Sequence, residues 1–120
     1  MALAKTFRDL LERYRRGERD FAGPELDTDL SNDLSDLRLD GMDLFHSFIV
    51  ANFRSASSVG AHFHQANLKT CDFSNADLTA ADFSGALCAT TFAGAPMNAT
   101  DFTGAFCNSL ILQAGENPDW

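Results

Sequence analysis

The chain has 120 residues, of which 45% are hydrophobic, and a formal net charge of −8. Its length allows a single domain, and its negative charge disfavours direct binding to nucleic acid, because phosphate contacts need clustered lysine and arginine. No apolar run is long enough to span a membrane, no secretory signal is visible, and the odd number of cysteines argues against a disulfide framework. We expect a soluble, cytoplasmic protein.

Residues 1–20 have the pattern of a short amphipathic helix that stops near Gly17. Basic residues lie between apolar residues spaced three or four apart. The apolar set is Leu3, Phe7, Leu10, Leu11 and Tyr14. We expect this helix to cap the open end of the domain that follows it. Binding to a membrane or to a calmodulin-like partner is the alternative.

Residues 21–113 repeat with a period of five. Each unit has a large apolar centre and a small residue two positions before it, as in Ala66-Asn67-Leu68. The period is one residue short before Phe48 and again before Leu87. The centres that form the predicted structural core are Phe48, Phe53, Phe63, Leu68, Phe73, Leu78, Phe83, Leu87, Phe92, Met97 and Phe102.

A period of five fits neither a helix nor a plain strand, so each unit must be a short extended segment followed by a turn. Several units end in glycine or asparagine, which tight turns favour; these are Gly60, Asn75, Gly85, Gly94 and Gly104. Regular turns coil the chain, and successive coils pair through backbone hydrogen bonds about 4.8 Å apart. Phenylalanine alternates with leucine-like centres, which predicts four faces per coil with two columns of phenylalanine on opposite walls.

The prediction is therefore an all-β solenoid, a four-sided β-helix of about four coils. The helix within residues 1–20 caps it, the β-helix covers residues 21–113, and residues 114–120 form a tail that includes Trp120.

This pattern resembles the pentapeptide repeat family over roughly residues 21–113. The units that carry the resemblance include Cys71-Asp72-Phe73 and Ala81-Asp82-Phe83. The resemblance implies a right-handed β-helix and a bacterial protein. Three positions depart from the pattern, because His46 and Leu110 occupy small-residue positions and Ser58 replaces a large centre.

Two histidines are the first candidates for chemistry. His62 and His64 flank Phe63 and should both point outward, with Asp43 and Asp82 on the coils either side of His62. Such a group can bind a metal in principle. Columns of aspartate and histidine are also ordinary surface pairing, and on that interpretation we expect no metal site.

The cysteines give no catalytic nucleophile. Cys71 and Cys107 take inward positions, and Cys88 is expected to be exposed with no base beside it. We therefore predict no catalytic residue, no cofactor and no enzyme activity.

Two surfaces are candidates for binding. The first is the column of Asp43, His62, Asp82 and Asp101, which adjoins an acidic first coil; charge reversal there should weaken binding without changing the melting temperature. The acidic first coil contains Asp20, Glu25, Asp27, Asp29, Asp33, Asp36, Asp40 and Asp43.

The second candidate surface is the apolar C-terminal end, formed by Phe106, Leu110, Ile111 and Leu112. Exposed apolar clusters often mark interaction sites. This end could instead cap the solenoid, join two copies into a homodimer, or reflect a shift in register. Ile49 and Cys88 are expected to point outward on the same face as Phe106.

The predicted function is that of a non-enzymatic protein–protein interaction module with rigid, flat faces and a protein partner. One alternative, implied by the family resemblance, is a DNA mimic that inhibits or protects DNA gyrase, which a supercoiling assay would test. The other alternative is a structural unit that associates end to end.

Overall fold

The computed structural model describes residues 7–21, 25–26, 33–68, 71–88, 91–108, 110–116 and 118. It contains one helix and five two-residue strands within these residues. The elements in chain order are α1 (Phe7–Arg15), β1 (Glu25–Leu26), β2 (Phe48–Ile49), β3 (Leu87–Cys88), β4 (Phe106–Cys107) and β5 (Leu110–Ile111). Of the predicted features, Leu3, Asp27, Asp29 and Trp120 lie outside the described residues.

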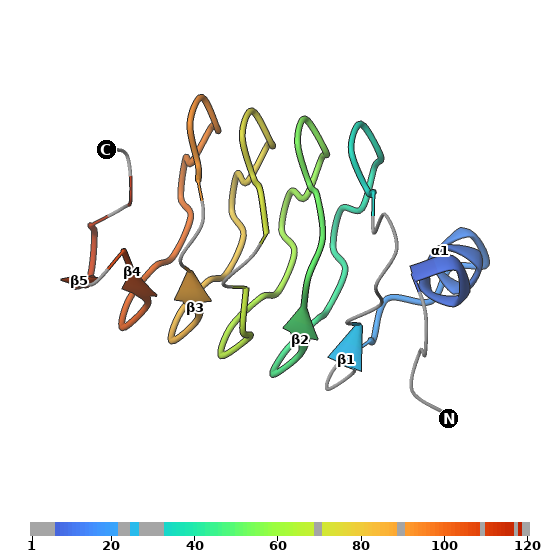
Figure 1. The fold of residues 1–120 in the computed structure, drawn as a ribbon, viewed down its shortest axis with the longest axis horizontal. Coiled ribbons are helices and arrows are strands. Elements are labelled where there is room, and N and C mark those ends of the chain that lie inside the picture. The colour runs from blue at the N-terminus through green and yellow to red at the C-terminus, as the bar shows by residue number, and fades with distance from the viewer. Residues whose placement is uncertain are drawn as a thin grey trace.

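The chain forms a β-helix solenoid in which successive coils lie side by side (Figure 1). Parallel backbone pairing joins each coil to the next, as where Asp33 pairs with Asn52 and His62 pairs with Asp82. The same parallel register joins β1 to β2 and β3 to β4. Residues paired in this way are separated by about 20 positions in the sequence, a length at the short end of the solenoid repeats. Side chains about 20 positions apart therefore lie next to one another on successive coils.

Two columns of stacked phenylalanine rings fill the interior. Neighbouring rings in a column lie 4.8–5.5 Å apart with nearly parallel planes, and rings in opposite columns meet edge to face at 5.4–5.8 Å. Both geometries are favoured by aromatic quadrupoles. One column is Phe53, Phe73 and Phe92, and the other is Phe63, Phe83 and Phe102. The prediction of two phenylalanine columns is confirmed.

The prediction that Phe48 and Leu87 are core residues is wrong. Phe48 is 39% exposed and Leu87 is 36% exposed, whereas the residues after them, Ile49 and Cys88, are buried. Neighbouring side chains in an extended segment point to opposite sides, and the five-residue step continues unbroken from Leu44 to Ile49. The period is therefore short by one residue after each of these strands and not before it.

The corrected register also accounts for His46. Ser47 is the buried small residue of this unit, and His46 is the exposed turn residue with a φ of 62°. The other predicted core centres are buried, except that Met97 is only partly buried. Ser58 is fully buried, and its hydroxyl has no hydrogen-bond partner among the described residues.

The turns between units use a left-handed backbone conformation. All five predicted turn residues have a positive φ, from 58° at Asn75 to 74° at Gly104. Ala80 occupies the equivalent place with a φ of 60°. An L-residue other than glycine is strained there because its Cβ approaches the following carbonyl.

Exchanging glycine and alanine at these turns should change stability in opposite directions. Ala80→Gly should raise the free energy of unfolding by about 0.5–1 kcal/mol, because relief of strain exceeds the added entropy of the unfolded chain. Gly60→Ala should lower it by about 1 kcal/mol, since Gly60 has a φ of 68° and open space around an added Cβ, so that the change adds backbone strain without a steric clash. Urea denaturation of both variants measures this, and effects of the same sign would contradict it.

Helix α1 lies against one end of the solenoid, at the opposite end from the C-terminus (Figure 1). Leu10 is fully buried in the core, and the Tyr14 hydroxyl donates a hydrogen bond of 2.7 Å to the Asp40 carbonyl oxygen. The helix ends at Arg15, followed by Gly17 with a φ of 98°, and the Glu18 amide bonds back to the Arg13 carbonyl. This glycine-terminated helix end is the predicted one.

The chain itself covers the other end of the solenoid, which is one of the alternatives expected from the sequence. Strand β5 turns back and pairs antiparallel with β4, with Phe106 opposite Ile111. Leu112 is buried and forms backbone hydrogen bonds with the last full unit, through its amide to the Ala105 carbonyl and its carbonyl to the Gly104 amide. The reversal covers the β4 edge with a strand of the same chain.

Candidate functional site

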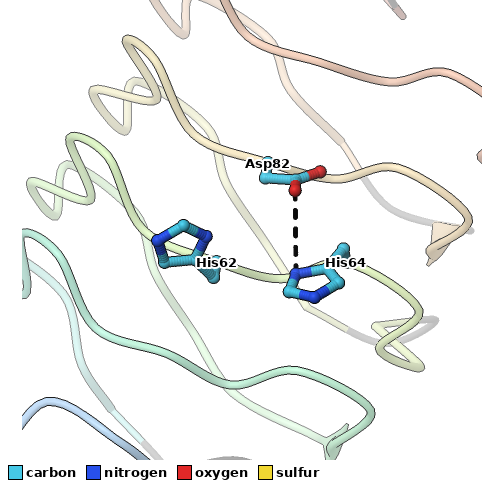
Figure 2. Close-up of side chains that lie close together, drawn as sticks. All are labelled: His62, His64 and Asp82. Carbon is cyan, nitrogen blue, oxygen red and sulfur yellow. Dashed lines mark ion pairs between the residues drawn. The ribbon is translucent and has the colours of Figure 1, made fainter.

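The column of Asp43, His62, Asp82 and Asp101 exists as predicted. Each residue forms a parallel backbone pair with the next one along the solenoid. His62 and Asp101 are exposed, and Asp43 and Asp82 are half-buried. His64 joins this column from the side: its Nδ1 lies 3.7 Å from Asp82 Oδ2 (Figure 2).

The carboxylates of this column hold the turns of their own units. Asp43 Oδ1 accepts a hydrogen bond of 3.0 Å from the Phe45 amide. Asp82 Oδ1 accepts bonds from the amide and hydroxyl of Ser84, at 2.9 and 2.6 Å. A side chain that bonds the backbone two residues on stabilises a turn. Charge reversal at these positions should therefore lower the melting temperature, contrary to the expectation from the sequence.

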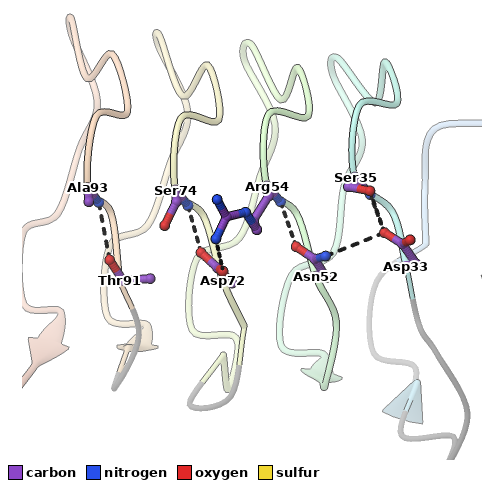
Figure 3. Close-up of polar contacts among 8 residues, drawn as sticks. All are labelled: Asp33, Ser35, Asn52, Arg54, Asp72, Ser74, Thr91 and Ala93. Atoms are coloured by element: carbon purple, nitrogen blue, oxygen red, sulfur yellow. Dashed lines mark hydrogen bonds and ion pairs between the residues drawn. The ribbon is translucent and has the colours of Figure 1, made fainter.

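A second polar column repeats the same turn on another part of the surface (Figure 3). Asp33, Asn52, Asp72 and Thr91 pair in succession along the solenoid. In each unit the side-chain oxygen accepts a hydrogen bond of 2.9–3.3 Å from the amide two residues on. The recurrence shows that Asp, Asn and Thr before the turn have a structural role in the fold.

These hydrogen bonds lower the pKa values of several carboxyl groups. The hydroxyl and then the amide of Ser35 lower the pKa of Asp33, and those of Thr103 lower the pKa of Asp101. At Asp72 burial raises the pKa, but hydrogen bonds from Ser74 and the charge of Arg54 outweigh it, so the net change is a lower pKa.

The fold should consequently lose stability in acid. A carboxyl group whose pKa is lowered in the folded protein binds protons more readily in the unfolded chain. Its contribution to the free energy of unfolding is therefore complete above the unfolded pKa of about 3.9, and it is lost as the pH falls through the pKa of the folded protein. The melting temperature followed by circular dichroism should fall below about pH 4. Asp72→Asn and Asp101→Asn together should reduce this fall, because asparagine can still accept the turn bonds. A melting temperature that stays constant down to pH 3, roughly one unit below the unfolded value, would contradict the prediction.

The exposed apolar residues also form a column, which we call the apolar stripe: Phe48, Leu87, Phe106 and Ile111. Phe48 and Leu87 both pair with Asn67, Leu87 pairs with Phe106, and Phe106 pairs with Ile111. Their exposed fractions are 39%, 36%, 45% and 63% in that order. This stripe was not predicted from the sequence, because Phe48 and Leu87 were expected inside and Ile49 and Cys88 outside. Counting five residues onward from Leu44 and Phe83 would have revealed it.

The predicted end interface is only partly available. Phe106, Leu110 and Ile111 are exposed, but Leu112 is buried and cannot contact a partner. Phe106 of β4 and Ile111 of β5 pair with each other and end the apolar stripe. Both strands lie at the C-terminal end of the solenoid (Figure 1).

All three cysteines are free and buried, so the prediction of an exposed Cys88 is wrong. Its position inside follows from the corrected register of β3. Burial raises the pKa of Cys71 to about 12. The pKa of Cys88 is also raised, through its hydrogen bond with Cys107 and through burial. The thiols of Cys71 and Cys88 are therefore poor nucleophiles at neutral pH.

Comparison with protein families identifies the repeat. Residues 47–85 match the family model described as pentapeptide repeats, in eight copies. This segment belongs to the pentapeptide repeat family. No curated protein matches the chain. No helix among the described residues is long and apolar enough to cross a membrane.

Solved structures of pentapeptide repeat proteins are similar to this chain. One from Nostoc Pcc 7120 is 27% identical, with 98% of this chain and 93% of that chain covered and a TM-score of 0.45. One from the Arabidopsis thaliana thylakoid lumen is 28% identical, with 70% and 68% covered and a TM-score of 0.38. HetL of Nostoc sp. strain PCC 7120, involved in heterocyst differentiation regulation, is 26% identical, with 82% and 37% covered and a TM-score of 0.33.

Proposed function

We propose that the chain is a non-enzymatic protein-binding module, a right-handed, four-sided β-helix of about four coils. The backbone pairs join positions that are four repeat units apart, which supports four five-residue units per coil. The stacked phenylalanine columns support a rigid interior. The pentapeptide repeats of residues 47–85 then hold outward side chains at fixed spacing. Three free cysteines fit a reducing compartment, the bacterial cytoplasm.

The apolar stripe is the observation that carries this proposal. Large apolar side chains stand here at outward positions where the paired residues of the other columns are polar or charged. Exposed apolar patches often mark interaction sites. Leu87, Phe106 and Ile111 are direct neighbours in the stripe, and Phe48 lies beyond Asn67. The residues of the stripe lie on paired strands, so their backbone is already ordered. Binding a partner therefore costs little conformational entropy.

The column of Asp43, His62, Asp82 and Asp101, which we call the acidic column, is the weaker candidate, although the sequence favoured it. Asp43, Asp82 and Asp101 each use Oδ1 within their own turns, so their presence is explained without a partner. The residues of the apolar stripe form no hydrogen bond with their side chains and stabilise no turn. We therefore infer a protein partner that presents a narrow apolar strip to the stripe.

A comparison of three proteins tests the proposal. The wild type, a stripe variant (Phe48→Ser, Leu87→Ser and Phe106→Ser) and an acidic-column variant (Asp43→Asn, Asp82→Asn and Asp101→Asn) are used to capture proteins from the organism that makes the chain. A partner should be bound by the wild type and the acidic-column variant and be lost with the stripe variant. Light scattering of the purified wild type separates this result from self-association. Loss of the partner only with the acidic-column variant would contradict the proposal.

A further inference from the structure

Two histidines and an aspartate converge on the face of the acidic column (Figure 2). His62 and His64 flank the buried Phe63, and Asp82 comes from the following coil, where it pairs with His62. One potential ligand atom from each of the three side chains lies within 4.8 Å of the other two. The parallel register of the coils therefore brings together two imidazoles and a carboxylate.

The Nδ1 atom of His64 is buried and has no hydrogen-bond partner in the part of the chain that the structure describes. It faces Asp82 Oδ2 at 3.7 Å, which is too long for a hydrogen bond. The ring is held in this orientation by Phe45, which stacks on it with centroids 4.4 Å apart and planes 5° apart. A buried nitrogen without a partner is costly, and a cation between this nitrogen and the carboxylate would remove that cost.

We propose that His62, His64 and Asp82 bind one divalent transition-metal ion of the zinc class. Imidazole nitrogen and carboxylate oxygen are zinc ligands at about 2.0–2.2 Å. Two nitrogen donors disfavour calcium and magnesium, which prefer all-oxygen sites. Three protein ligands leave the fourth position for water or for a donor from a bound protein.

The surroundings fit a bound cation. Asp82 uses Oδ1 for its own turn and leaves Oδ2 directed at His64. Asp43 pairs with His62 on one side, and Asp101 pairs with Asp82 on the other, so negative charge lies along the column. Ligands of a tetrahedral zinc ion stand about 3.4 Å apart. Rotation of the exposed His62 side chain and a small movement of Asp82 would close the group around the metal.

Equilibrium dialysis of the full chain against zinc chloride, with the bound metal quantified, tests the site. The wild type should bind about one zinc ion per chain with saturation, as expected of a single three-ligand site. His64→Gln and Asp82→Asn should each weaken binding at least about tenfold. Asparagine can still accept the Ser84 bonds that hold the turn, so Asp82→Asn is expected to fold. His46→Gln is the matched control, because His46 is exposed and lies outside the cluster.

The melting temperature measured with and without zinc distinguishes binding to the folded protein from binding to the unfolded chain. Zinc should raise the melting temperature of the wild type and of His46→Gln, but not that of His64→Gln or Asp82→Asn, because only a ligand that prefers the native state stabilises it. Absence of bound zinc in the wild type would overturn the proposal. Equal binding by the wild type and both site variants would also overturn it.

Discussion

Phe83→Ala should lower the free energy of unfolding by about 3–5 kcal/mol, the usual cost of emptying a buried phenylalanine site. The Phe83 ring is fully buried and stacks between Phe63 and Phe102, at 4.9 and 5.0 Å. It also meets Phe73 and Phe92 edge to face, at 5.5 and 5.8 Å. Because each coil is supported only by its neighbours, a gap here weakens the contacts of the coils on both sides.

Phe106→Ala is the matched control for this change. The same side chain is removed, but Phe106 is 45% exposed and lies on the outside of the solenoid. Its loss should cost less than about 1 kcal/mol, as for most surface substitutions. Urea denaturation followed by circular dichroism compares the two variants. Similar losses of stability would mean that the inside and outside of the coils have been assigned wrongly.

Leu10→Ala should lower the free energy of unfolding by about 2–4 kcal/mol. Leu10 of α1 is fully buried, and it belongs to the same hydrophobic cluster as Leu34, Leu39 and Leu44 of the adjacent coil. The helix covers the end of the stack, so its loosening exposes apolar surface and unpaired backbone of that coil.

The helix variant should also show a local effect. Amide hydrogen exchange of Leu39 and Leu44 should accelerate more than that of Phe83, which lies farther along the solenoid. Arg15→Ala, on the exposed side of the same helix, is the control and should leave both stability and exchange unchanged. Unchanged stability in Leu10→Ala would show that α1 is not a required cap.

The five-residue period made most of the fold predictable. A short exact period places equivalent side chains at equivalent positions, so the phenylalanine columns and the glycine turns follow from counting. Phe53, Phe73 and Phe92 stack as counted, and Asn75 and Gly85 have the positive φ expected of turn residues.

The register was not predictable where the period breaks. At Phe48–Ile49 and at Leu87–Cys88 two apolar residues are adjacent, so hydrophobicity alone does not decide which one points inward. The structure buries Ile49 and Cys88 because that choice keeps the five-residue step from the preceding unit. The reversal of the chain at β5 could not be predicted from the period. An antiparallel strand departs from the parallel coils that the five-residue repeat predicts.

The group of His62, His64 and Asp82 was predictable in part. The pairing of His62 with Asp82 follows from the length of the coil. The approach of His64 to Asp82 depends on Phe45, a residue of a different coil that fixes the imidazole ring by stacking. A contact of this kind depends on side-chain orientation, which the repeat does not specify.

Site-specific photo-cross-linking tests the central claim most directly. The photoreactive amino acid benzoylphenylalanine replaces Phe48 or Phe106 of the apolar stripe in two proteins, and Asp101 of the acidic column in a third. These proteins are expressed in the organism that makes the chain and are irradiated. We predict that one and the same partner protein is cross-linked from Phe48 and from Phe106, and not from Asp101. Cross-linking from Asp101 alone would contradict the assignment of the apolar stripe as the binding surface.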